Sequence, residues 1–257
     1  MSLLPPYKVA FFTVLSCPNA YSFTFSTLKR VVFFINIVCI SLKSCTFATV
    51  LYGLVKQMNV AIVKYNAGNI GSVENAMRRL GIQPTVTDDP EIICAADRVI
   101  FPGQGEARSA MEYLKAHRLD EVIVGLKQPV LGICIGMQLL CRHSEEQDTE
   151  CLGVFDVDVK RFEPQNHEDK VPQMGWNTIE DTKSVLFTGF EKPEYVYFIH
   201  SFYVPKCEWT IATTNYIQPY SSALHKDNFY ATQFHPEKSG SVGERILKNF
   251  ITMRNQE

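Results

Sequence analysis

The chain has 257 residues, a net charge of −2 and a hydrophobic fraction of 46%, values that are typical of a globular protein with a substantial core. The charge is unevenly distributed, because residues 1–57 contain five basic and no acidic residues, whereas residues 58–257 contain 20 basic and 27 acidic residues. A mildly acidic body argues against nucleic acid as a partner.

Residues 1–57 differ in composition from the rest of the chain, and three interpretations compete. A membrane span would have to include Asn36 and Lys43, and each apolar half is too short to cross alone. A transit peptide fits the absence of acids but not the single arginine. We prefer a third interpretation, in which the true start is Met58 and residues 1–57 are a leader outside the fold. We therefore expect one domain at residues 58–257 and no membrane partner.

From Met58 onward, short apolar runs alternate with amphipathic segments. Strands are expected at 60–63, 85–87, 98–101 and 130–133, and helices at 73–80, 107–116 and 119–126, the first of them capped by Ser72 and ended by Gly81. This β-α-β alternation predicts an α/β fold with a mostly parallel, doubly wound sheet. Ligands of such sheets bind at the carboxyl ends of the strands.

The pattern beyond Cys151 is rich in β-structure. Strands are expected at 155–162, 177–179, 195–199, 210–213, 222–224 and 230–234. We interpret them as an antiparallel addition to the parallel core. A last helix is expected from about Val242, with Ser241 and Glu244 forming a capping box.

The eight cysteines are irregularly spaced, at positions 17, 39, 45, 94, 134, 141, 151 and 207. They form neither a C-x-x-C pair nor a cluster with histidine at metal-ligand spacing. We therefore expect no metal and no cofactor, and a cytoplasmic protein with free thiols.

Cys134 is the candidate nucleophile, because it stands where the buried strand at 130–133 turns at once into a helix starting near Gly136. The glycines at positions 132 and 136 remove side chains that would collide at such a sharp turn. A thiol at a helix N-terminus is favoured as the thiolate. The pattern is that of a nucleophile elbow with sulfur in place of oxygen. A buried structural cysteine in a tight glycine turn would give the same pattern.

A base and its orienting group are expected about a hundred residues further on. Pro236 favours extended backbone at His235, and residues two apart on extended chain face the same way, so His235 and Glu237 are expected to meet. A thiolate, a histidine and a carboxylate are the parts of a cysteine-based catalytic triad. A lone histidine at a strand end is usually structural, but the neighbouring proline and glutamate favour the catalytic interpretation.

These motifs together resemble the class I (triad) glutamine amidotransferases, and within them the glutaminase subunits of imidazole glycerol phosphate synthase in histidine biosynthesis. The elbow and the segment 233–239 are shared by the whole class. The narrower resemblance rests on Tyr-Asn-Ala-Gly-Asn at 65–69, Pro-Gln-Met-Gly-Trp-Asn at 172–177 and Tyr-Phe-Ile-His-Ser-Phe at 197–202. The resemblance covers residues 58–257. It implies a flavodoxin-like amidotransferase fold with a β-rich C-terminal half.

The resemblance also implies the chemistry. Cys134, His235 and Glu237 would form the triad that hydrolyses L-glutamine to glutamate and ammonia through a thioester. Gln138 and Ser201 would contact the substrate, although they also suit an exposed helix residue and a hydroxyl at a sheet edge.

A loop after the strand at 98–101 is expected to complete the site. Gly103 and Gly105 allow the peptide at Gln104 to turn over, and they would lie against the substrate. The backbone N–H groups of Gln104 and Ile135 would then stabilise an oxyanion. An ordinary glycine turn is the alternative. Because other members usually have a small apolar residue in place of Gln104, a role for its side chain stays open.

The ammonia implies a partner, because it is useful only if a second active site receives it. The resemblance implies a separate (β/α)8-barrel cyclase subunit in a heterodimer, faced by Asn69, Trp176 and Lys238. Trp176 also suits a core aromatic.

Three other classes of protein compete with this interpretation. A stand-alone cysteine hydrolase or redox sensor would share the elbow but would not need His-Pro-Glu. A silent binding module could have lost triad members, yet all three are present. The amidotransferase subunits of anthranilate or aminodeoxychorismate synthesis are disfavoured by the Met-Gly-Trp-Asn motif at 174–177.

Overall fold

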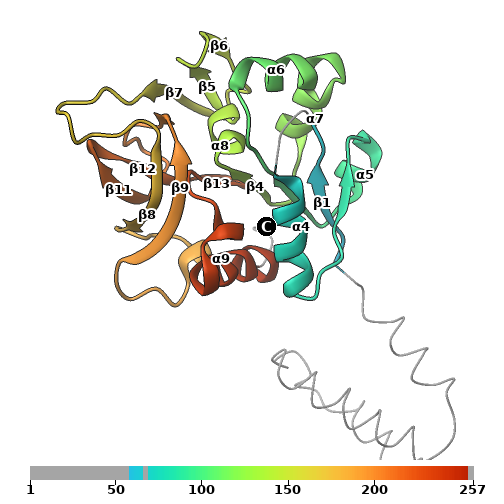
Figure 1. Cartoon of the computed structure of the whole chain (residues 1–257). Coiled ribbons are helices and arrows are strands. Elements are labelled where there is room, and N and C mark those ends of the chain that lie inside the picture. Colours follow the sequence, from blue (N-terminus) through green and yellow to red (C-terminus); the bar gives the residue numbers. More distant parts are fainter. Residues whose placement is uncertain (1–57, 66–68, 254–257) are drawn as a thin grey trace, which may run out of the picture. The chain divides into compact units, whose positions relative to one another are not determined.

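The computed structural model describes residues 58–65 and 69–253 (Figure 1). The chain divides into two compact units, Met1–Gln57 and Met58–Glu257. The interpretation of residues 1–57 as a leader lies outside the described residues.

A seven-stranded sheet forms the centre of the second unit. In spatial order its strands are β11 (Thr210–Tyr216), β12 (Gln218–Lys226), β13 (Phe229–Thr232), β4 (Val130–Ile133), β3 (Arg98–Phe101), β1 (Val60–Val63) and β2 (Thr85–Thr87). The five strands from β13 to β2 pair in parallel, and β11 and β12 add an antiparallel edge. The predicted mostly parallel sheet is confirmed. The assignment of β13 to the antiparallel addition is wrong, since β13 is antiparallel only to its hairpin partner β12.

Helices cover both faces of this sheet, because its buried strands present apolar side chains alternately to either side. On one face, Val60 and Ile62 pack with α4 (Ile70–Arg79) and α9 (Gly240–Thr252). On the other face, Ala61 and Val63 pack with α5 (Pro90–Ala95), α6 (Ala107–Ala116) and α7 (Leu119–Gly125). The two hydrophobic cores define a doubly wound α/β layer structure.

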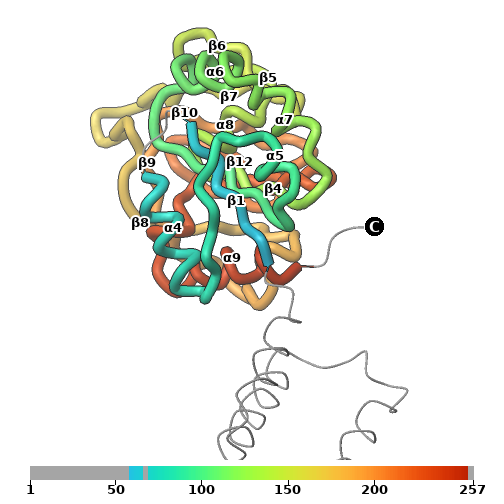
Figure 2. The backbone as a smooth tube through the Cα atoms, turned by 90° about the vertical axis from the view of Figure 1, so that its right-hand side faces the viewer, coloured from blue at the N-terminus to red at the C-terminus, as the bar shows by residue number. Residues whose placement is uncertain are grey.

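Two smaller sheets complete the unit. One has the order β10 (Phe202–Tyr203), β7 (Phe155–Arg161), β5 (Cys141–Ser144) and β6 (Thr149–Glu150), and the other is a ribbon of β8 (Gln173–Ile179) and β9 (Glu194–His200). The short element α8 (Ile135–Leu139) connects β4 to β5, η2 (Val185–Phe187) connects the two strands of the ribbon, and η3 (Pro236–Lys238) connects β13 to α9. In Figure 2, as in Figure 1, α6 lies with β5 and β6 at one end and α9 lies at the other.

Both predicted N-terminal helix caps are wrong, whereas Gly81 follows the end of α4 with φ of 80°, as expected. Helix α4 already begins at Ile70, and its N-cap is Asn69 in the left-handed conformation with φ of 68°. Helix α9 begins at Gly240, whose φ of 58° turns the chain directly out of η3, so Ser241 lies inside the helix. Glu244 instead pairs with Arg79 at 2.7 Å. Local turns set by tertiary contacts override the capping signals.

No helix among residues 58–65 and 69–253 combines the length and hydrophobicity needed to cross a bilayer.

Candidate active site

Cys134 lies between the end of β4 and the start of α8. Its φ of 53° and ψ of −108° are strained for a residue with a side chain, as expected at a nucleophile elbow. The Cys134 N–H donates to the Thr232 carbonyl at 2.7 Å, and the Cys134 carbonyl accepts from Met137 and Gln138 in the first turn of α8. Both sides of the elbow are therefore fixed by backbone hydrogen bonds.

The glycines on either side of the elbow are required by close approach. A Cβ on Gly136 would lie 2.1 Å from the Phe101 carbonyl oxygen at the end of β3. A Cβ on Gly132 would lie 2.8 Å from a methyl of Leu140. The predicted steric role of both glycines is confirmed.

His235 and Glu237 form a buried pair. Nδ1 of His235 and Oε1 of Glu237 are 2.8 Å apart, and each side chain is only 1% exposed. The two residues meet for a different reason from the predicted one. His235 is extended, but η3 starts at Pro236, so a 3-10 turn rather than an extended strand brings Glu237 onto the imidazole.

The charges around His235 favour its protonated form. Burial by itself lowers the pKa of His235, but the Cys134 sulfur and the Glu237 carboxylate outweigh it, and the pKa rises to about 10. Nε2 of His235 has no hydrogen-bond partner among the described residues, so it is free to exchange a proton with the sulfur or with a substrate. The raised pKa therefore keeps the His235 imidazole protonated at neutral pH.

Asn69 is part of this constellation. Its Nδ2 donates to Oε1 of Glu237 at 2.8 Å, so the carboxylate is held by both the imidazole and an amide. The sequence predicts Asn69 as a partner-facing residue and gives no signal for this contact. The contact arises because asparagine tolerates the left-handed N-cap of α4, and α4 packs against η3.

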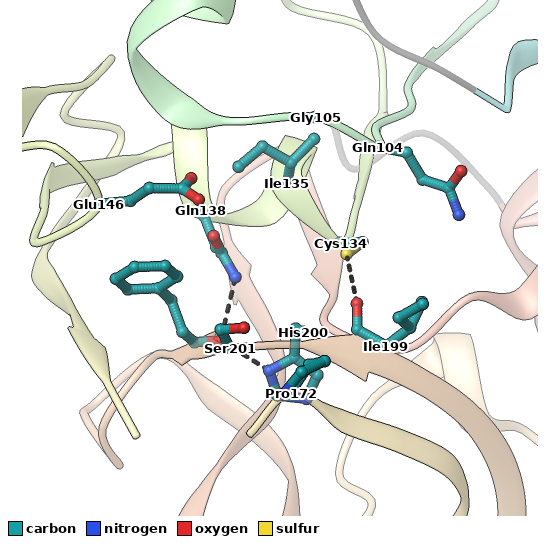
Figure 3. A pocket seen from close by; sticks show the side chains of 11 residues that line it. Gln104, Gly105, Cys134, Ile135, Gln138, Glu146, Pro172, Ile199, His200 and Ser201 are labelled. Atoms are coloured by element: carbon teal, nitrogen blue, oxygen red, sulfur yellow. Dashed lines mark hydrogen bonds between the residues drawn. The ribbon is translucent and has the colours of Figure 1, made fainter. Parts of the chain in front are cut away.

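A cavity of about 340 Å³ opens in front of the sulfur (Figure 3). Six predicted site residues line it, namely Gln104, Gly105, Cys134, Ile135, Gln138 and Ser201. His235 and Glu237 lie outside this lining, and so does Gly103. The remaining lining residues are Glu146, Pro172, Ile199, His200 and Phe202.

Glu146 gives the cavity a carboxylate that no sequence motif indicates. It lies between β5 and β6, and in Figure 3 its side chain lies beside Gln138. Burial raises its pKa despite a hydrogen bond of 2.8 Å from the Ala107 N–H. A loop carboxylate carries no sequence signal of its own. The carboxylate and the Gln138 amide oxygen together suit a ligand that carries an ammonium group.

The glycine loop packs directly on the elbow. A Cβ on Gly103 would lie 1.7 Å from a methyl of Ile135, so close approach requires this glycine. The φ of Gly103 is not positive, whereas Gly105 has φ of 153°, a backbone conformation that favours glycine. The Tyr65 hydroxyl donates to the Pro102 carbonyl and anchors the loop. In Figure 3 the Gln104 side chain points away from Gln138.

Ile135 is the first residue of α8, where backbone N–H groups have no acceptor within the helix. Such a group beside the thiol is suited to binding a negative oxygen. No group of three or more metal-ligating side chains occurs among residues 58–65 and 69–253.

The sequence matches one family over most of its length. A profile described as glutamine amidotransferase class-I matches residues 61–253. The imidazole glycerol phosphate synthase subunit HisH of Bacteroides thetaiotaomicron is 65% identical over 196 residues, which are 76% of this chain and 100% of that protein. The HisH subunit of Escherichia coli is 43% identical over 198 residues, with the same shares covered. The chain belongs to the HisH family of class-I glutamine amidotransferases.

Solved structures agree with this amidotransferase fold. A putative GMP synthase protein of Thermoplasma acidophilum matches with a TM-score of 0.59 and 20% identity, over 76% of this chain and 92% of that one. A glutamine amidotransferase of Thermotoga maritima matches with a TM-score of 0.52 and 20% identity, over 76% and 82% of the two chains. The HisH chain is accordingly an enzyme, a glutaminase subunit.

In this HisH chain, Trp176 is not a core aromatic, because it is 56% exposed on β8. Met174 and Tyr195 are also exposed, and the pairing of β8 with β9 places all three on one face of the ribbon. We call these three residues the ribbon patch. Lys238 ends η3, and no carboxylate among the described residues pairs with it.

Proposed function

We propose that Cys134, His235 and Glu237 are the catalytic triad with which this HisH subunit hydrolyses L-glutamine. The observation that carries the proposal is the buried His235–Glu237 pair, whose free imidazole nitrogen serves the strained Cys134 thiol. These are the nucleophile, the base and the orienting carboxylate that acyl transfer requires.

The reaction proceeds in two halves. The Cys134 thiolate attacks the carboxamide carbon of glutamine, and the oxygen becomes negative beside the N–H groups of Gln104 and Ile135. His235 gives its proton to the departing nitrogen, so ammonia leaves and a thioester remains. Water then attacks the thioester while His235 takes a proton from it, and glutamate leaves with the free thiolate restored.

The cavity positions the other end of the substrate. The Glu146 carboxylate and the Gln138 amide oxygen bind the α-ammonium group, since both are acceptors on the wall of the same cavity. Ser201 and Gly105 line that cavity and contact the rest of the amino acid. Gly103 lies outside this lining, and its close approach to Ile135 positions the adjacent Gln104 peptide.

The ammonia goes to a second subunit. The relatives are named as subunits of imidazole glycerol phosphate synthase, so the partner of this chain is the cyclase subunit of that enzyme, a (β/α)8 barrel, in histidine biosynthesis in the cytoplasm. The ribbon patch, whose apolar side chains are exposed, and the unpaired Lys238 bind it. Asn69 contributes to this face through its backbone while its side chain holds Glu237.

The test is Cys134→Ser in the complex with the cyclase. Glutamine-dependent synthesis should be lost, while synthesis from added ammonium salts continues, because the cyclase needs only ammonia. Cys94→Ser, which changes an exposed thiol, is the matched control and should retain both activities. Loss of both activities in an intact Cys134→Ser complex would contradict a pure ammonia-supply role. Retained glutamine-dependent activity would contradict the nucleophile assignment.

A further inference from the structure

A chain of two buried amides leads from a backbone carbonyl to the nucleophile. Nε2 of Gln138 donates to the Phe202 carbonyl at 3.1 Å and to Oε1 of Gln233 at 3.0 Å. Nε2 of Gln233 lies 3.7 Å from the Cys134 sulfur. Gln233 is fully buried and Gln138 is only 3% exposed, so water does not compete for these groups.

The orientation of both side-chain amides in this series of hydrogen bonds is fixed at one end. The Phe202 carbonyl can only accept, so Gln138 must turn its NH2 group toward it and toward the next amide. Gln233 must therefore present its oxygen to Gln138, which leaves its NH2 group for the sulfur. A flip of either amide would bring two acceptors or two donors together inside the core.

The sheet register explains why Gln233 reaches the sulfur. β13 and β4 are parallel, and Thr232 pairs with Ile133, so Gln233 and Cys134 are the next residues along neighbouring strands. The Gln233 N–H also donates to the Ser222 carbonyl at 2.9 Å, which ties the residue to β12 on the other side.

We propose that Gln233 is a further residue of the catalytic centre, whose amide donates to the Cys134 sulfur and stabilises the thiolate. The inference rests on the proposed function, in which Cys134 is the nucleophile. Hydrogen bonds to a charged group are stronger than those to a neutral one, so the Gln233 N–H favours the thiolate over the thiol.

Among the described residues, the other uncharged groups that face Cys134 do not donate to its sulfur, in contrast to Gln233. Burial keeps Tyr65 and Tyr220 neutral by raising their pKa values well above normal. Burial also lowers the pKa of His200 to about 4, so that imidazole is neutral as well. The Ile199 carbonyl, 3.8 Å from the sulfur, accepts only from a thiol.

Among residues 58–65 and 69–253, two charged groups remain, and they act in opposite directions. Glu146 lines the same cavity and disfavours a thiolate. His235 supplies the positive charge that favours it. Gln233 therefore adds a neutral donor to the positive charge that His235 supplies.

The experiment measures how alkylation of Cys134 by iodoacetamide depends on pH in the full chain, with the Cys134 peptide quantified by mass spectrometry. Gln233→Met keeps the length of the side chain and removes the donor. We expect the midpoint of the profile to rise by about one pH unit, the effect of removing one hydrogen bond to a charge. Below that midpoint the alkylation rate should fall about tenfold. Gln128→Met is the matched control, because it removes an amide that bonds Ile93 near the opposite end of β4, and its profile should not move.

An unchanged midpoint in folded Gln233→Met would overturn the inference. If Gln233→Met does not fold, Gln233→Glu carries the test, because its carboxylate has the same shape and still accepts from Gln138 but repels a thiolate. Its midpoint should then rise further, and an unchanged midpoint would again reject the role of Gln233. Failure of the proposed function gives a different result, since Cys134→Ser would then still hydrolyse glutamine.

Discussion

Gly136→Ala places a methyl group at the tightest contact of the elbow. The new Cβ would lie 2.1 Å from the carbonyl oxygen of Phe101 and 3.1 Å from its carbonyl carbon. Real contacts of this kind are longer than 3.0 Å, so one side must move by about 1 Å. Phe101 is held by its pairing with Gly132 in the sheet, so the displacement falls on the elbow and on Cys134.

The expected cost follows from that displacement. Forcing a methyl group into a packed core typically destabilises a protein by about 1–3 kcal/mol. For a domain of this size, each kcal/mol lowers the melting temperature by about 2–4 °C. A misplacement of about 1 Å at a nucleophile costs on the order of 100-fold in rate. We therefore expect a folded protein with a modestly lower melting temperature and a kcat reduced about 100-fold.

The assay is glutamine hydrolysis in the complex with the cyclase, together with thermal melting of the isolated chain. Gly71→Ala is the matched control, because a Cβ there meets nothing within 4 Å and the position is exposed on α4. That variant should keep full activity and gain up to about 1 kcal/mol of stability. If Gly136→Ala matched Gly71→Ala in both kcat and melting temperature, the steric account of the elbow would be refuted.

Three further outcomes are expected. Asn69→Ala should lower kcat about tenfold with little change in KM, because Glu237 loses a charge-assisted hydrogen bond, and a higher KM at unchanged kcat would contradict this positioning role. The pKa of His235 is raised to about 10, so its contribution to stability is fully present below the unfolded value of about 6.5 and is lost as the pH rises through about 10. Urea unfolding should therefore show wild type losing stability relative to His235→Asn across that range, and parallel curves would refute the shift. Deleting residues 1–57 should leave folding and glutaminase activity unchanged, and an insoluble or inactive product would reject the leader interpretation.

The catalytic chemistry depends largely on local sequence. Cys134 was identifiable because a short apolar strand, two glycines and a helix start leave only one geometry for the turn, and the observed φ of 53° is that geometry. The adjacency of His235 and Glu237 was predicted correctly, although a 3-10 turn and not an extended strand produces it.

Most of the strand and helix order was equally accessible, although helix α5 (Pro90–Ala95) between β2 and β3 was not predicted. The parallel core from β1 to β4 follows from alternating apolar runs and amphipathic segments, whose periods are local properties of the chain. The parallel pairing of β13 with β4 could not be predicted from the sequence, because the residues of a strand do not specify which strand it pairs with.

The surroundings of the triad were decided by tertiary structure. Asn69, Glu146 and Gln233 come from a helix cap, a β-hairpin and a strand end, and no local pattern indicates the hydrogen bond or cavity position that each of them takes. They reach the site only after the sheet register and the helix packing have formed. A turn's geometry depends on a few consecutive residues, whereas a hydrogen bond such as Asn69 to Glu237 joins positions 168 residues apart. The sequence alone thus determined the elbow at Cys134 and the His235–Glu237 pair, and the packing of distant elements decided which polar side chains surround them.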